Sequence, residues 1–165
     1  MTICNIDDTI TQIKAGQRLM GLDVGKKTIG IALGDPGHKI ASPHRILWRQ
    51  KFSTDMAELF NEMEALAVGG LVIGWPLLMN GDKGPACDSV RDFAHALIRI
   101  KDVPIMFQDE RLSTHAVEKS MIEADLTRKK RHNKRDALAA SWILQSAFDQ
   151  YQLSYQNKKI KILDV

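Results

Sequence analysis

The hydrophobic pattern changes its period along the chain, and this change restricts the possible folds most strongly. Residues 18–24 and 28–33 read as two strands joined by the turn Gly25-Lys26-Lys27, and residues 40–49 form a third extended segment. From Ala57 onward the apolar residues recur at helical spacing. The remaining elements alternate as strand, helix, strand, helix and helix, at about residues 71–74, 90–98, 103–108, 113–124 and 134–151. This order predicts an α/β fold with a mixed, five-stranded sheet and helices on both faces.

The length of 165 residues fits one domain. We expect a leader segment or short extra element over residues 1–17, the domain itself over 18–151 and a C-terminal tail over 152–165. No stretch has the pattern of a signal peptide or the roughly 20 apolar residues of a membrane span. Cys4 and Cys87 lack metal-ligand spacing, so reduced thiols and a cytoplasmic location without membrane contact are expected.

Acidic residues recur where the predicted strands end. Asp23 lies toward the end of the first strand, Asp109 and Glu110 end the strand 103–108, and Asp136 begins the last helix. Ligands in open α/β sheets bind outside the carboxyl ends of the parallel strands. The sequence therefore predicts that acids from distant parts of the chain meet at one edge of the sheet.

Each acid also has a structural interpretation. Asp23 could be an ion-pair partner within its apolar strand, because a buried carboxylate needs compensation. Asp136 could be a helix N-terminal acid favoured by the helix dipole. Asp109 and Glu110 are neighbours in a strand, so they should point to opposite faces. We favour Glu110 as the residue that joins the site, with Asp109 capping the next helix or pairing with Arg111.

Five short motifs, in order, resemble one known family over about residues 19–151. They are Asp23-x-Gly25 with Lys27 and Ile29-Gly30, then Ala41-x-Pro43, Gly74-Trp75-Pro76-Leu77 with Asn80-Gly81, Asp109-Glu110-Arg111-Leu112-Ser113-Thr114, and Lys134-x-Asp136 with Ala139-Ala140. The chain resembles the YqgF/RuvX group of ribonuclease H-like proteins, described as Holliday junction resolvases and as nucleases of pre-16S ribosomal RNA. It departs from the family pattern at Trp75, which replaces a leucine, and at Leu78, where a polar residue is common.

The resemblance implies a divalent-metal-dependent nuclease. It assigns the catalytic role to Asp23, Glu110 and Asp136, and the same three residues, with Asp109 as an alternative, would bind Mg²⁺ or Mn²⁺. Phosphodiester hydrolysis needs a nucleophile made from water and stabilisation of charge on two oxygens, which two hard cations about 4 Å apart can supply. Mg²⁺ prefers oxygen ligands and keeps several waters, so a few carboxylates suffice.

Basic residues near these acids are candidates for phosphate contacts. Between residues 128 and 135 there are six Lys or Arg and no acid. A solvated basic loop is the alternative interpretation of that run. The residues expected to bind nucleic acid are Lys27, Arg111, Thr114, Arg128, Lys129, Lys130, Arg131 and Lys134. Thr114 is first of all a candidate helix cap.

The family resemblance favours processing of the 5′ end of pre-16S ribosomal RNA in ribosome biogenesis. The alternatives are a Holliday junction resolvase in DNA recombination or repair and a non-catalytic nucleic-acid-binding module. The partner is then an rRNA precursor or branched DNA, and the protein is a monomer or homodimer. A sugar-kinase or actin-like ATPase also opens with Asp-x-Gly, but that fold needs a duplicated second domain, for which this chain is too short.

Overall fold

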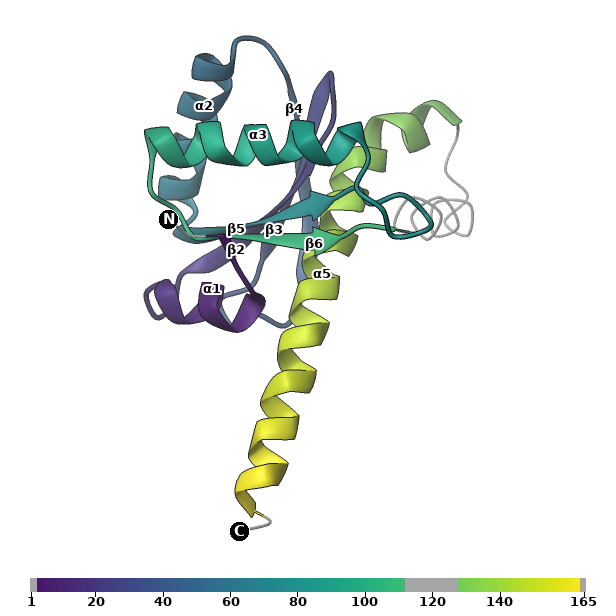
Figure 1. The fold of residues 1–165 in the computed structure, drawn as a ribbon. Coiled ribbons are helices and arrows are strands. Elements are labelled where there is room, and N and C mark those ends of the chain that lie inside the picture. The colour runs from purple at the N-terminus through teal and green to yellow at the C-terminus, as the bar shows by residue number, and fades with distance from the viewer. Residues whose placement is uncertain (1–2, 112–127, 164–165) are drawn as a thin grey trace.

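A mixed sheet of six strands forms the centre of the molecule. The computed structural model describes residues 3–111 and 128–163 (Figure 1). Its elements are β1 (Ile3–Cys4), α1 (Ile6–Gln12), β2 (Arg18–Val24), β3 (Thr28–Gly34), β4 (Ala41–Trp48), α2 (Phe52–Ala65), β5 (Val68–Trp75), α3 (Pro85–Ile100), β6 (Ile105–Asp109) and α5 (Arg128–Leu163). The strand order is β1-β6-β5-β2-β3-β4, with β2, β3 and β4 antiparallel and the other pairings parallel. The predicted mixed α/β architecture is confirmed.

The sheet has one strand more than the five predicted. The two-residue β1 pairs in parallel with β6 through Ile3 and Cys4, at the sheet edge opposite β4. A short helix follows, in which the Asn5 side chain accepts a hydrogen bond from the backbone N–H of Asp8. Ile6 of this helix is buried in the core below the sheet. β1 and α1 thus precede the first predicted strand, and the two residues of β1 are too few to show a strand period in the sequence.

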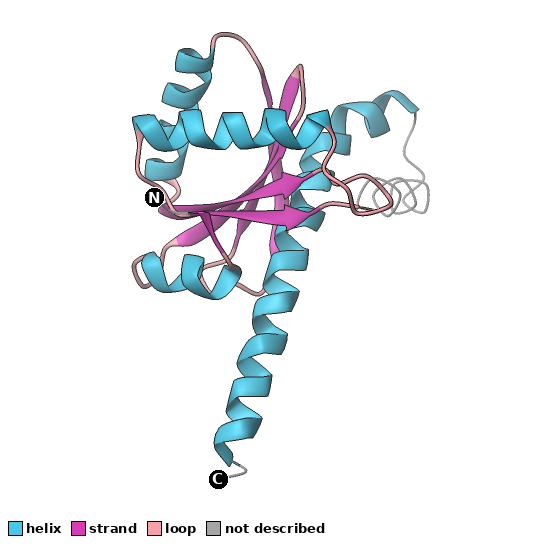
Figure 2. Ribbon diagram, in the orientation of Figure 1, coloured by secondary structure: helices cyan, strands magenta, loops and turns pink. Residues whose placement is uncertain are grey.

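Helices cover both faces of the sheet, as Figure 2 shows. Alternate residues of β2, β3, β5 and β6 pack against α2 and α3 on one face, in a core that includes Leu22, Ile31 and Ile73. The other residues of the same strands face α1 and α5, with Leu19 and Val72 among them. The period of two along each strand therefore sorts side chains into two separate cores.

Helix α5 lies unusually close to the sheet, because glycines face it. A Cβ atom at Gly21 would lie 2.8 Å from the carbonyl oxygen of Ala140, and one at Gly34 would lie 2.5 Å from the ring of Phe148. At Gly30 a Cβ would collide with the backbone carbonyl of Asp136. Any larger residue at these three positions would push the helix away from the strands.

The last helix is longer than the predicted 134–151. It begins at Arg128 and continues to Leu163, so the basic run 128–135 is helical rather than a loop, and the expected tail extends the same helix. Its end projects beyond the domain (Figure 1), and Lys158 and Ser154 bind the carboxylate of Asp7 in α1. The helix expected over 113–124 lies outside the described residues.

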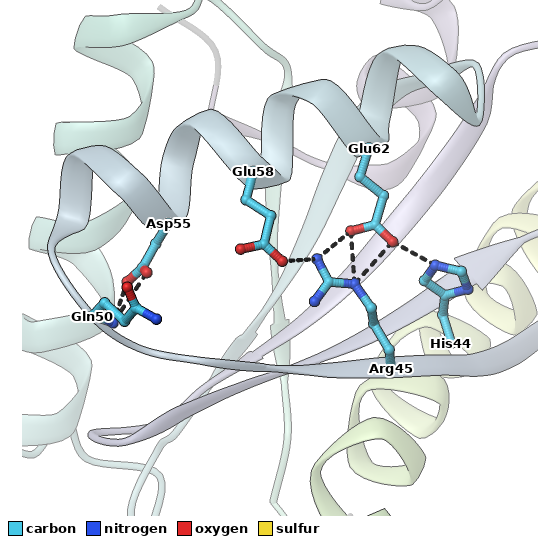
Figure 3. Close-up of polar contacts among 6 residues, drawn as sticks. All are labelled: His44, Arg45, Gln50, Asp55, Glu58 and Glu62. Carbon is cyan, nitrogen blue, oxygen red and sulfur yellow. Dashed lines mark hydrogen bonds and ion pairs between the residues drawn. The ribbon is translucent and has the colours of Figure 1, made fainter.

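Helix α2 is fixed to the edge strand β4 by ionic contacts. Arg45 donates to Glu62 through Nε and Nη2, at 2.9 and 2.6 Å, and also pairs with Glu58 at 2.9 Å (Figure 3). His44 Nε2 lies 2.6 Å from the same Glu62 carboxylate. Burial raises the pKa of Glu62, but the bonds from Arg45 and His44 outweigh it and hold that pKa below its ordinary value. These contacts lie on the face of the sheet that α2 covers.

No helix within the described part of the chain is both long and apolar enough to cross a membrane.

The close packing of α5 generates a stability prediction. We expect Gly30→Ala to lower the free energy of unfolding by more than about 2 kcal/mol, because two stretches of backbone would have to separate. Gly37→Ala is the matched control, since a Cβ there would meet a side-chain oxygen of Asp35 rather than the backbone of another element, and it should cost less than Gly30→Ala. Urea denaturation measures both values, and equal losses would contradict the account.

Candidate active site

Asp23 lies near the carboxyl end of β2, on the face that α5 covers. It pairs with Gly30 of the neighbouring strand, and its neighbours Leu22 and Val24 face the opposite core. Burial raises the pKa of Asp23 to about 6, with a further contribution from the charge of Asp136, while Arg135 acts in the opposite direction. This partly buried carboxylate is therefore destabilised in its charged form.

Asp136 reaches the same place from α5. The helix begins eight residues earlier, at Arg128, so Asp136 lies inside the helix and is not a helix-capping acid. Its backbone carbonyl lies over Gly30, and its carboxylate accepts a hydrogen bond from the Thr28 hydroxyl at the start of β3. These two contacts from β3 fix both the backbone and the side chain of Asp136.

Glu110 approaches Asp23 from the other side. It follows the last residue of β6, and its N–H donates to the carbonyl oxygen of Trp75 at 3.2 Å. Its carboxylate lies over Gly74, where a Cβ atom would collide with it. Burial raises the pKa of Glu110 to about 7, and the charges of Asp23 and Asp109 add to the increase.

Asp109 and Glu110 have different partners. The Asp109 carboxylate contacts Arg111 at 2.6 Å through Nη2 and accepts from the Arg111 backbone N–H at 2.9 Å. The hydrogen bond from the Arg111 side chain lowers the pKa of Asp109 below its ordinary value, although slight burial opposes it. Strand alternation puts Asp109 on the face of Phe107, away from α5. The structure therefore brings Glu110, rather than Asp109, toward Asp23.

The predicted basic residues surround this edge only in part. Lys27 is exposed in the turn between β2 and β3, and Lys134 is exposed on α5. Arg111 is exposed and paired with Asp109. The backbone of Arg128, Lys129, Lys130 and Arg131 belongs to α5, but their side chains lie outside the description, as does the whole of Thr114.

Three residues without a predicted role of their own complete the arrangement. Thr28 donates to Asp136, Gly74 makes room for Glu110, and Arg135 is the cation that acts on Asp23. Gly30 and Gly74 were visible as parts of motifs. Only the tertiary structure shows that Gly30 makes room for helix α5 and Gly74 for the Glu110 carboxylate. Thr28 carried no signal beyond its place at the start of a strand.

Asp23 interacts with both of the other acids. The charge of Asp23 raises the pKa of Glu110, and the charge of Asp136 raises the pKa of Asp23. Among the residues whose side chains are described, no three His, Cys, Asp or Glu groups are close enough to hold one ion together. Asp23 therefore interacts electrostatically with each of the other two acids, and all three carry the carboxylate oxygens that Mg²⁺ and Mn²⁺ prefer.

Comparisons with known proteins agree with this architecture. A relative from Paramagnetospirillum magneticum is 46% identical over 86% of this chain and 92% of its own length, and its name is "Putative pre-16S rRNA nuclease". A relative of the same name from Bartonella quintana is 41% identical over 92% of this chain and 96% of its own. The RuvC protein of T. thermophilus, solved with a Holliday junction substrate, matches with a TM-score of 0.53 at 12% identity, over 82% of this chain and 96% of that one.

The likeness to RuvC shows the ribonuclease H-like fold. Residues 17–150 match the RuvX family, which is described as Holliday junction resolvase. The resemblance read from the five motifs is therefore confirmed, and the chain belongs to the RuvX family.

Proposed function

We propose that this protein is a divalent-metal-dependent nuclease that hydrolyses phosphodiester bonds in structured nucleic acid. The observation that carries the proposal is the approach of Asp136 and Glu110 to Asp23 from opposite sides, at the carboxyl edge of the parallel strands. The charged forms of Asp23 and Glu110 carry an energetic cost there, because burial and neighbouring carboxylates raise their pKa values. Binding of cations is the simplest compensation for that cost.

The carboxylates would hold the cations, with Asp23 common to both pairs. Bound Mg²⁺ or Mn²⁺ supplies an activated water and neutralises charge on the attacking and leaving oxygens. Thr28 keeps the Asp136 carboxylate oriented, and the Glu110 N–H bond to Trp75 fixes where β6 ends. Arg135 favours the charged form of Asp23, which is the form that binds metal.

Basic residues at the same edge would bind the substrate backbone. Lys27 and Lys134 are exposed there, and the run 128–135 extends α5 beyond the sheet. Such contacts give affinity that falls with salt, without reading the sequence. We propose Arg111 and the run 128–131 as further phosphate contacts, together with Thr114.

The first substrate to test is the 5′ region of pre-16S ribosomal RNA, because relatives above 40% identity carry that name. That role would place the protein in the cytoplasm. A Holliday junction is the second candidate, supported by the family description and by the RuvC fold. Gel assays with Mg²⁺ or Mn²⁺ on both substrates separate the two. Binding of either without cleavage would instead favour a non-catalytic binding module.

The adjacent acids of β6 offer a matched pair of variants. We expect Glu110→Gln and Asp23→Asn each to lower the cleavage rate by at least about 100-fold, because each removes a charged ligand. Asp109→Asn should lower it by less than about fivefold, because that carboxylate binds the exposed Arg111 instead. Single-turnover cleavage measures these rates, and a greater loss from Asp109→Asn than from Glu110→Gln would reverse the assignment.

The raised pKa values of Asp23 and Glu110 predict a pH-dependent cost to stability. The folded protein binds protons at these groups more tightly than the unfolded chain, so this cost is absent below about pH 4, grows between about pH 4 and the raised pKa values of about 6 and 7, and is constant above them. In metal-free buffer at pH 8 we expect Asp23→Asn to be more stable than wild type by about 1–2 kcal/mol, after allowance for solvent screening. Near pH 4 the difference should vanish.

Added Mg²⁺ should raise the melting temperature of the wild type at pH 8 and leave that of Asp23→Asn nearly unchanged. Equal responses to Mg²⁺ in both proteins would show that the ion binds elsewhere. If wild type and Asp23→Asn were equally stable at pH 8 in metal-free buffer, the charge of the Asp23 carboxylate would already be compensated by other groups of the protein.

A further inference from the structure

The loop between β5 and α3, residues 76–84, exposes two adjacent large apolar side chains at its tip. Leu78 is 50% exposed and Met79 is 71% exposed. Single exposed apolar residues are ordinary on protein surfaces. This pair differs because its two members are neighbours in one loop.

Hydrogen bonds within the loop hold the tip in one shape. The Leu78 N–H donates to the Asp82 carbonyl at 2.9 Å, and the Gly81 N–H donates back to the Leu78 carbonyl at 2.8 Å. The Asn80 side chain bonds Asp82 twice, accepting from its N–H at 3.0 Å and donating to its carboxylate at 2.8 Å. Gly81 has φ +90, which suits glycine. These bonds preform the turn that carries the two apolar side chains. Leu78 is half exposed and packs against Gly84, and Met79 is the more exposed of the two.

This turn lies beside the proposed active site. The carbonyl oxygen of Trp75 accepts from the N–H of Leu77 at the loop's start and from the N–H of Glu110. On the other side of the loop, a Cβ at Gly81 would lie 3.4 Å from the Arg111 guanidinium. Lys83 lies over the Trp75 ring, 6.0 Å from its centroid. The loop therefore has Arg111 and Lys83 beside it, and the Trp75 carbonyl oxygen joins its start to the backbone of Glu110.

An apolar projection bordered by cations matches the chemistry of nucleic acid. Cations hold the phosphates, while Leu or Met side chains can insert between bases and unstack them. We propose that Leu78 and Met79 form a wedge that separates bases next to the cleaved phosphate. This inference rests on the proposed nuclease function and narrows its substrate to sites where bases unstack easily, such as branches and the ends of duplexes. A continuous duplex would be a poor substrate.

Fluorescence of 2-aminopurine, which increases when the base loses its stacking, tests the wedge. The probe is a stem with a single-stranded extension that carries 2-aminopurine at the junction, prepared as RNA and as DNA, with a continuous duplex for comparison. Full-length protein is added in Ca²⁺ so that binding is read without cleavage. The double variant Leu78→Ser/Met79→Ser is compared with wild type, and Ile100→Ser is the control. Ile100 is 55% exposed at the far end of α3.

Wild type and Ile100→Ser should raise the junction fluorescence about threefold or more, in the RNA probe, the DNA probe or both. The double variant should lose this increase and bind the junction about tenfold more weakly, with an unchanged salt dependence and melting temperature. A full fluorescence increase from the double variant would overturn the wedge. Wild-type binding without an increase would overturn it and leave the nuclease proposal standing. Failure to bind any probe would overturn both.

Discussion

The close approach of α5 to the sheet is the constraint on which the candidate site depends. Gly21, Gly30 and Gly34 remove the side chains that would hold the helix away, and the carbonyl of Asp136 lies directly over Gly30. Without that approach the Asp136 carboxylate would not reach Thr28 or act on Asp23. The glycines thus allow the close packing of α5 that places the Asp136 carboxylate. They also lower stability, because Gly loses more conformational entropy on folding than other residues do.

The site collects negative charge that the protein itself only partly compensates. Burial and mutual repulsion raise the pKa values of Asp23 and Glu110, and Arg135 offsets part of the effect at Asp23. A structural ion pair would instead lower these pKa values, as Arg111 does for Asp109 and Arg45 does for Glu62. Asp23 and Glu110 thus differ from the ion-paired acids Asp109 and Glu62, and this difference favours a ligand-binding role for Asp23 and Glu110.

Much of this arrangement could be read from the sequence, because it follows from local periods. Alternation along β6 predicted that Asp109 and Glu110 point to opposite faces of the sheet. Gln108 pairs with Gly74 on the α5 face, and Glu110, two residues later, lies on the same face. The strand β1 and the length of α5 were missed, since a two-residue strand has no period and a basic run resembles a solvated loop. Thr28 was missed because its partner lies 108 residues away, a contact that only tertiary structure creates.

Binding of divalent ions at Asp23 can be tested without reference to activity by anomalous diffraction from crystals soaked in Mn²⁺. We expect anomalous peaks within coordination distance, about 2.0–2.3 Å, of the Asp23 carboxylate, with Glu110 or Asp136 as a second ligand. Peaks at Asp109 instead, or no peak at Asp23 in fully soaked crystals, would contradict it.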